Sequence, residues 1–191
     1  MKTGLFFGSF NPVHIGHMAI ANYFVEYTDI EQLWFVISPQ NPLKKKKTLL
    51  ADYHRLELVV RAIDYDTRFR ASDVEFHMPR PSYTIDTLTY LEEKYPQHEF
   101  AIIMGEDGLA SFHKWKNFEL IIRNYKRYVY RRPGSDPEFL KNAENIEVVD
   151  APQMEISSSF IRKAISEGHD MRFYVPDKVY QYMDEMHFYE K

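Results

Sequence analysis

Two histidines near the start of the chain have the spacing that an anion-binding site needs. His14 and His17 are separated by Ile15 and Gly16, and they follow a short apolar run that ends at Gly8. Residues three apart in a helix share a face, so both imidazoles are expected on one side of the first helical turn. A helix N-terminus also attracts anions through its free N–H groups and its dipole. The pattern therefore predicts a phosphate site.

This histidine pair has two alternative interpretations. One histidine would cap the turn while the other packs under a sheet, or both would bind zinc, for which paired histidines are common ligands. The chain contains no cysteine, and residues 8–17 contain no Asp or Glu, so zinc is disfavoured. Gly8 is expected to leave its strand in a conformation that a side chain would resist, and to let a ligand approach the backbone closely.

Two later stretches predict further contacts with a nucleotide. Serines occupy residues 157–159, and Arg162 follows about one turn later. One serine suffices as a helix cap, so the set predicts a second anion site. Gly105 and Asp107 follow the apolar run 100–104. Asp107 is suited to accept hydrogen bonds from ribose hydroxyls, and a solvated turn is the alternative.

A run of lysines, residues 44–47, lies in the loop 38–48 that leaves the end of a predicted strand. Open α/β sheets bind their ligands at the carboxyl edge of the strands. Most of these lysines are expected to be solvated, and Lys44 is the candidate for a phosphate contact.

Together these stretches describe a triphosphate held between two helix N-termini, with a ribose at a third loop. The sequence offers no covalent nucleophile with a paired base, and no Gly-x-x-x-x-Gly-Lys-Ser/Thr loop. Direct attack of one bound phosphate on the α-phosphorus of ATP needs no protein nucleophile. It needs alignment, and positive charge where the leaving pyrophosphate develops its own negative charge.

Apolar patterning predicts the elements that position these residues. Continuous apolar runs indicate buried strands of a parallel sheet at 5–7, 33–37, 100–104, 128–130 and 146–149, with a weak strand at 69–71. Helices are expected at 18–27, 52–63, 84–95, within 112–125, and at 157–167 and 176–188. Asp52 is a candidate cap for its helix. The inner face of that helix is predicted to be Leu56, Val59, Val60 and Ile63.

Composition limits the class of protein. A chain of 191 residues most simply forms one domain, and its net charge of −4 argues against non-specific nucleic-acid binding. The absence of cysteine fits a reducing compartment. The first residues do not form a signal peptide, and no apolar run reaches membrane-spanning length, so a cytoplasmic protein is expected.

At this point the residues carry a family resemblance. Residues 8–17 (GSFNPVHIGH) and 156–162 (ISSSFIR) resemble the two signatures of the nucleotidyltransferase superfamily. Within it, nearly the whole chain is similar to bacterial nicotinate-nucleotide adenylyltransferases. The further stretches that carry the similarity are 39–44, 81–84, 87–88, 105–107, 115, 131–134 and 175–176. The chain departs from the family at Asn11, where Asp is usual, and at Ser9, where Gly or Thr is common.

The resemblance implies an α/β fold, a doubly wound Rossmann-like parallel sheet, in one domain of residues 1–191 with a small helical part from about residue 157. It implies transfer of the adenylyl group of ATP to nicotinate mononucleotide, with Mg²⁺, giving nicotinate adenine dinucleotide and pyrophosphate in NAD biosynthesis. The attack would be direct and in line, without a covalent intermediate. ATP and nicotinate mononucleotide are the implied partners, nucleic acid and membranes are not, and a homo-oligomer is left open.

The resemblance also assigns site residues. The catalytic contacts with the ATP phosphates would be His14, His17 and Arg162. Other ATP contacts would be Gly8, Ser9, Phe10, Gly105, Asp107 and Ser158. Nicotinate mononucleotide would contact Tyr83, Thr84, Trp115, Lys44 and Arg132. No residue is assigned to a resident metal.

Three other functions compete with this one. Phosphopantetheine adenylyltransferases share both phosphate signatures, but residues 81–84, Trp115 and residues 131–134 argue against them. Residues 14–17 also spell the HIGH signature of class I aminoacyl-tRNA synthetases, yet nothing is left over to bind tRNA. A non-catalytic nucleotide-binding regulator would not need both histidines.

Overall fold

The computed structural model describes residues 1–39, 49–131 and 144–191. In these ranges a parallel sheet of six strands has the order β3-β2-β1-β4-β5-β6. The strands are β1 (Lys2–Gly8), β2 (Gln32–Ile37), β3 (Phe69–Ser72), β4 (Glu99–Gly105), β5 (Arg127–Tyr130) and β6 (Ile146–Val149). The chain moves outward from β1 to β3 and then returns beside β1 to build the other half. This order confirms the predicted doubly wound, Rossmann-like sheet.

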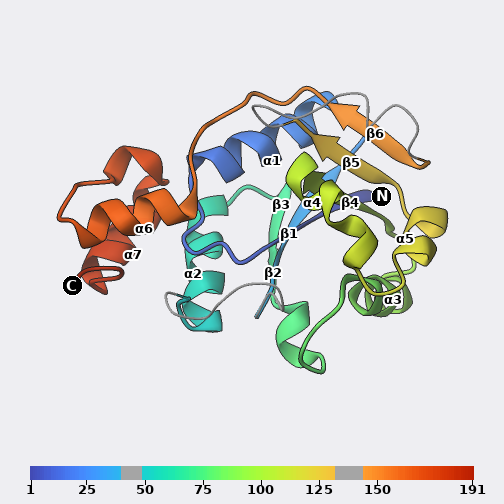
Figure 1. The fold of residues 1–191 in the computed structure, drawn as a ribbon, viewed down its shortest axis with the longest axis horizontal. Helices are drawn as coiled ribbons and strands as arrows, with labels where there is room; N and C mark the ends of the chain where they lie inside the picture. Colours follow the sequence, from blue (N-terminus) through green and yellow to red (C-terminus); the bar gives the residue numbers. More distant parts are fainter. Residues whose placement is uncertain (40–48, 132–143) are drawn as a thin grey trace.

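Helices cover both faces of the sheet (Figure 1). The α-helices are α1 (Ile15–Tyr27), α2 (Asp52–Ile63), α3 (Thr84–Lys94), α4 (Glu106–Ala110), α5 (Phe118–Asn124), α6 (Ser158–Ser166) and α7 (Asp177–Glu185). Short 3-10 helices are η1 (Val74–His77), η2 (Phe112–Lys114) and η4 (Arg172–Tyr174). In Figure 1, α1 and α2 lie on one side of the sheet, and α3, α4 and α5 lie on the other. No helix in the described ranges is long and apolar enough to cross a membrane.

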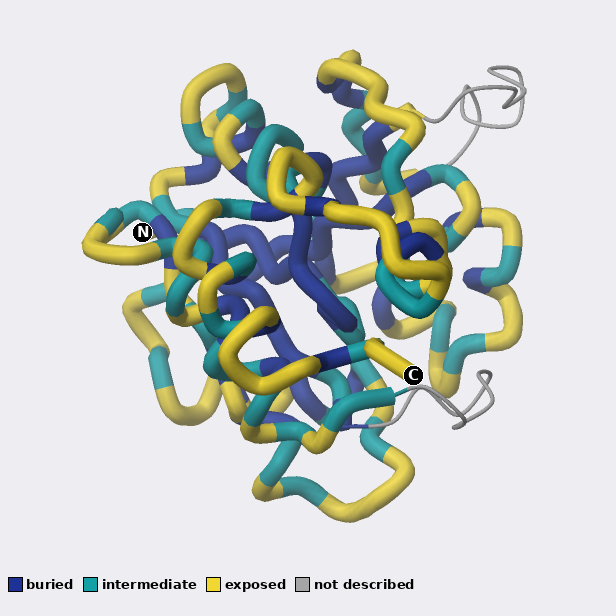
Figure 2. The backbone as a smooth tube through the Cα atoms, turned by 90° about the vertical axis from the view of Figure 1, so that its left-hand side faces the viewer, coloured by how far each residue is buried: buried dark blue, intermediate teal, exposed yellow. Residues whose placement is uncertain are grey.

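Two hydrophobic cores result from the alternation of side chains along the central strands. Phe6 and Phe35 belong to one buried cluster, shared with α1, α2, α6 and α7. Leu5 and Trp34 belong to the other, shared with α3, α4 and α5. Figure 2 shows buried backbone at the centre of the molecule, surrounded by segments of intermediate and exposed residues. The apolar runs are continuous because both faces of these strands are covered.

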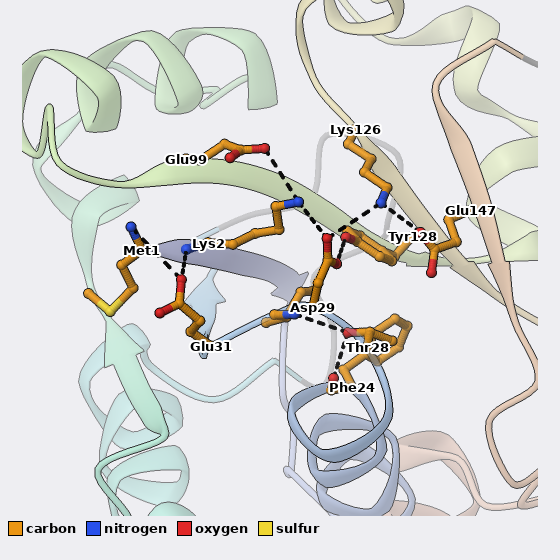
Figure 3. Close-up of polar contacts among 11 residues, drawn as sticks. Met1, Lys2, Phe24, Thr28, Asp29, Glu31, Glu99, Lys126, Tyr128 and Glu147 are labelled. Carbon is orange, nitrogen blue, oxygen red and sulfur yellow. Dashed lines mark hydrogen bonds and ion pairs between the residues drawn. The ribbon is translucent and has the colours of Figure 1, made fainter.

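A polar network fixes the amino-terminal edge of the sheet (Figure 3). Lys2 Nζ lies 2.6 Å from Asp29, whose carboxylate also accepts a hydrogen bond from the buried Tyr128 hydroxyl. Lys126 forms a further ion pair with Glu147 at 2.6 Å. Burial raises the pKa of Asp29, but hydrogen bonds from Lys2 and Tyr128 outweigh it, and the pKa lies below its usual value. The opposite, carboxyl edge carries the predicted site.

The expected helical C-terminal part is present, and the structure shows that it packs on α2. Val179 and Met183 of α7 are buried in the same cluster as Leu58 of α2. Lys178 Nζ also lies 2.6 Å from Asp64, which follows α2. The C-terminal segment therefore shares the apolar core of the sheet.

Three local predictions were wrong. Ala51, not Asp52, is the N-cap of α2, and Asp52 is the first residue of the helix. Val60 was predicted to face inward but is 44% exposed, because the inner face is turned toward Leu58 and Arg55. The loop expected after β4 is instead the short helix α4, which begins at Glu106.

Candidate active site

The carboxyl ends of β1 and β4 lie side by side, because these strands are neighbours where the strand order reverses. Phe6 pairs with Ile103, so Gly8 and Gly105 end their strands at the same level. Open α/β sheets bind ligands in the crevice at such a reversal point. The phosphate turn, our name for residues 8–17, and the segment from Gly105 that was predicted to contact ribose therefore leave the sheet at the same edge.

The turn after β1 owes its shape to Phe10 rather than to Gly8. The left-handed residue is Phe10, with φ 45°, so the predicted conformational role of Gly8 was wrong. A Cβ on Gly8 would lie 2.8 Å from Phe10 Cζ, and glycine is needed to admit that ring. Phe10 as a whole residue is only 2% exposed and belongs to the core.

The two histidines meet at the start of α1, as predicted. Their rings stack with centroids 3.7 Å apart. His14 is the N-cap residue, with φ −143°, rather than part of the first helical turn, and His17 is the third residue of the helix. The backbone N–H of His14 donates to His17 Nδ1 at 3.2 Å. Since Nδ1 accepts, the proton of a neutral His17 is on Nε2, which is then a donor.

The start of α6 joins this turn across the length of the chain. Ser158 Oγ donates to the carbonyl of Pro12 at 2.9 Å, and Arg162 Nη1 donates to the carbonyl of Asn11 at 2.8 Å. Ser157 is the N-cap, and its hydroxyl accepts from a backbone N–H at 3.1 Å. One serine caps the helix, as the sequence allowed, and the next one ties the helix to the turn. The residues of the two predicted anion sites therefore lie together.

Asp107 is the second residue of α4, and the N-cap of this helix is the buried Gly105. Asp107 is exposed, at the carboxyl end of β4. β4 pairs with β1, so Asp107 follows the strand next to the histidine turn. This place is the one predicted for a ribose contact.

The residues predicted to bind nicotinate mononucleotide come from two segments that contact each other. Tyr83 is the N-cap of α3, Thr84 is its first residue, and Trp115 follows η2. Lys116 Nζ lies 4.8 Å from the centroid of the Tyr83 ring and 2.9 Å from Asp86 of α3. The segment that carries Trp115 is thereby held beside the start of α3.

A buried carboxylate, which the sequence interpretation missed, holds the loop before Tyr83. Glu75 is 2% exposed and accepts hydrogen bonds from Ser82 Oγ at 3.0 Å and Thr87 Oγ1 at 2.9 Å. Burial raises the pKa of Glu75, and the hydroxyls of Thr87, Ser82 and Ser38 partly oppose it. Glu75 therefore links Ser38, which follows β2, with Ser82, which precedes Tyr83.

A second missed residue is Arg55, which is fully buried beneath the site. All of its bonds go to oxygen atoms of nearby loops and of α2. Nε donates to the carbonyl of Leu50 (3.1 Å), Nη1 to those of Ser9 (2.8 Å) and Ser38 (2.7 Å), and Nη2 to that of Pro39 (3.1 Å) and to Asp52 Oδ1 (2.6 Å). Asp52 also binds Arg80 at 2.8 Å. Arg55 thus ties the phosphate turn to the exit of β2.

Two predicted contacts, Lys44 and Arg132, lie outside the described residues. Within residues 1–39, 49–131 and 144–191, no three His, Asp or Glu side chains are grouped as a metal site would require.

The sheet order and the joined helix starts define a class, the nucleotide-binding transferases of Rossmann-like fold. In agreement, residues 5–164 match the family described as Cytidylyltransferase-like. Relatives named "Probable nicotinate-nucleotide adenylyltransferase" include one from Flavobacterium johnsoniae, 51% identical with 100% of both chains covered. Another, from Bacteroides thetaiotaomicron, is 47% identical over 97% of this chain and 92% of the relative. The chain therefore belongs to the cytidylyltransferase-like family and, within it, to the nicotinate-nucleotide adenylyltransferases.

Solved structures agree on the fold. The Plasmodium falciparum nicotinic acid mononucleotide adenylyltransferase complexed with NaAD superposes with a TM-score of 0.84, covering 98% of this chain and 97% of that one. The same enzyme complexed with APC gives a TM-score of 0.80. Sequence identity to these two structures is 21% and 20%, so the likeness supports the architecture alone.

Proposed function

We propose that the chain transfers the adenylyl group of ATP to nicotinate mononucleotide, giving nicotinate adenine dinucleotide and pyrophosphate. The observation that carries the proposal is the junction between the first turn and α6, where Ser158 and Arg162 bond to the carbonyls of Pro12 and Asn11. This junction brings residues from both ends of the chain together beside the two histidines. Relatives at about half identity, with full coverage, carry the name of this activity.

In the proposed mechanism, an oxygen of the mononucleotide phosphate attacks the α-phosphorus of ATP. The new bond joins that oxygen to the α-phosphorus, and the bond from the α-phosphorus to the bridging oxygen of pyrophosphate breaks. The protein supplies no nucleophile. It aligns the two phosphates, which lowers the entropic part of the barrier, and it stabilises the charge that develops on the leaving group.

His17 and Arg162 are the proposed sources of that stabilisation, with His14 stacked beside His17. Because Nδ1 of His17 accepts from the His14 N–H, Nε2 of a neutral His17 carries the proton, and we assign that N–H to a phosphate oxygen of ATP. Arg162 has further N–H donors of its planar guanidinium beyond the one that it gives to Asn11. The Ser158 hydroxyl donates its proton to the carbonyl of Pro12, so Ser158 is proposed to line the phosphate site rather than to donate to it. Gly8, Ser9 and Phe10, which lead into the histidine turn, are assigned to the same ATP site.

The remaining assignments follow the edge of the sheet. We assign Asp107, with Gly105 beside it, to the adenosine ribose. Tyr83, Thr84 and Trp115 are assigned to the nicotinate ring, which can stack on an aromatic face. Mg²⁺ is proposed to enter with ATP, because phosphate oxygens are hard ligands that this ion prefers. The whole chain would act as one unit, since the site takes residues from Gly8 to Arg162.

The test is a pyrophosphate-release assay on the purified chain with ATP and Mg²⁺. Nicotinate mononucleotide, nicotinamide mononucleotide and phosphopantetheine are supplied separately as acceptors. We expect the highest kcat/KM with nicotinate mononucleotide. Preferred turnover of phosphopantetheine would replace the proposed acceptor. ATP binding without turnover of any acceptor would instead support a regulator.

A further inference from the structure

The last residues of the chain have an unusual backbone. After α7 ends at Glu185, His187 and Tyr189 both have positive φ, 52° and 68°. A left-handed backbone conformation is uncommon for residues other than glycine, and it persists where surrounding contacts hold it. Between them, Phe188 is 8% exposed and its ring lies 4.7 Å from His54 and 5.5 Å from Tyr182. The tail is therefore anchored on α2 and α7.

This anchoring aims Tyr189 at the phosphate turn. Tyr189 Oη donates to Asn11 Oδ1 at 2.8 Å, and the backbone N–H of Leu50 donates to the same oxygen at 3.1 Å. Burial raises the pKa of the Tyr189 hydroxyl, while the nearby charges of Arg162 and Arg55 oppose that rise. The hydroxyl is thus a protonated donor at neutral pH, placed among the cationic groups of the site.

Asn11 passes this contact on to the proposed ATP site. Its side chain receives Tyr189 while its main-chain carbonyl receives Arg162 Nη1 at 2.8 Å. A residue held at both groups cannot rotate without disturbing one of the two partners. Asn11 therefore links the C-terminal tail to the Arg162 guanidinium, which also donates to Ser159 Oγ at 3.2 Å.

We propose that Tyr189 is a positioning residue for ATP, acting through Asn11 on Arg162. The inference rests on the proposed function in that it takes Arg162 to bind the phosphates. It also gives a reason for an amide side chain at position 11. The side-chain oxygen Oδ1 of Asn11 accepts the hydrogen bonds from Tyr189 and Leu50 without placing a negative charge beside ATP.

The experiment compares Tyr189→Phe with Tyr182→Phe. The control removes a hydroxyl of the same C-terminal segment, one that lies 2.9 Å from His54 Nδ1 and is not bonded to the turn. ATP binding in the presence of Mg²⁺ is measured by calorimetry, and KM for each substrate by pyrophosphate release. Both variants are expected to lose a similar, small amount of thermal stability.

Only Tyr189→Phe should bind ATP more weakly, by about two- to tenfold, the value of one neutral hydrogen bond. KM for nicotinate mononucleotide should not change. In an Arg162→Ala background, Tyr189→Phe should have no further effect on the ATP dissociation constant. Unchanged ATP affinity in Tyr189→Phe would overturn the inference, as would equal effects in both tyrosine variants or a full effect without Arg162.

Calorimetry keeps this inference separate from the proposed function. A wild-type chain that binds ATP but transfers nothing to nicotinate mononucleotide would refute the proposed function, while the ATP affinities of the variants would still decide the role of Tyr189. A wild-type chain that does not bind ATP would refute both.

Discussion

Replacement of the buried Arg55 by lysine should destabilise the fold and disturb the phosphate turn. A guanidinium has five N–H donors, and in Arg55 each one meets an oxygen at 2.6 to 3.1 Å. A lysine ammonium has three donors at one point, so at least two of these oxygens lose their partner. Each buried group left unsatisfied costs about 1–3 kcal/mol, which gives a loss of about 2–6 kcal/mol in the free energy of unfolding.

The assay is urea denaturation of Arg55→Lys beside a matched control, Arg61→Lys. Arg61 is on the same helix but is partly exposed, and its Nε lies 2.7 Å from Glu57. A surface pair of this kind contributes about 0–1 kcal/mol, so the control should stay close to the wild type. At this chain length, a loss of about 2 kcal/mol lowers the melting temperature by about 4–8 °C. Equal stability of Arg55→Lys and Arg61→Lys would refute the reasoning.

Three further predictions concern the site, its selectivity and the opposite edge of the sheet. His17→Ala should lower kcat by about 10- to 150-fold, since one charge-assisted bond to the leaving group is worth about 1.5–3 kcal/mol. The control His169→Ala, at an exposed histidine, should leave kcat unchanged. A wild-type kcat in folded His17→Ala would remove His17 from catalysis. Nicotinate mononucleotide should exceed the amide by at least about a hundredfold in kcat/KM, because a carboxylate can accept from two donors. Trp115→Ala should slow both acceptors alike, and a collapse of the ratio would show that the ring sets selectivity. Because the pKa of Asp29 is lowered by hydrogen bonds from Lys2 and Tyr128, which outweigh its burial, its stabilisation is present above about pH 4 and is lost as the pH falls through the lowered value; Asp29→Asn should flatten the acid limb of stability measured by urea titration, and an unchanged limb would contradict this.

The sheet could be predicted from the sequence because its strands are covered on both faces. Runs such as 33–37 and 100–104 are apolar at every position, and this signal does not depend on knowing the partner strand. The helix α4 was missed because five residues are too few to show a helical period.

The histidine turn and the serine-rich start of α6 were predicted because each carries its chemistry in consecutive residues. Arg55 and Tyr189 were not, because their roles arise from distant parts of the chain. Periodicity placed Val60 on the inner face of α2 and Arg55 outside that face. In the structure Val60 is exposed and Arg55 is fully buried. The pairing of Asp52 with Arg55, three residues apart, is the local signal that could have indicated it. No such signal connects Tyr189 with Asn11, which are 178 residues apart.

Attack of nicotinate mononucleotide on the α-phosphorus of ATP can be followed by isotopic labelling. The chain is incubated with nicotinate mononucleotide and Mg²⁺, in parallel with ATP labelled at the α-phosphate or at the γ-phosphate. We expect the α-label in nicotinate adenine dinucleotide and the γ-label in pyrophosphate. Release of the γ-label as inorganic phosphate, or its transfer to the mononucleotide, with no label in a dinucleotide, would contradict attack at the α-phosphorus.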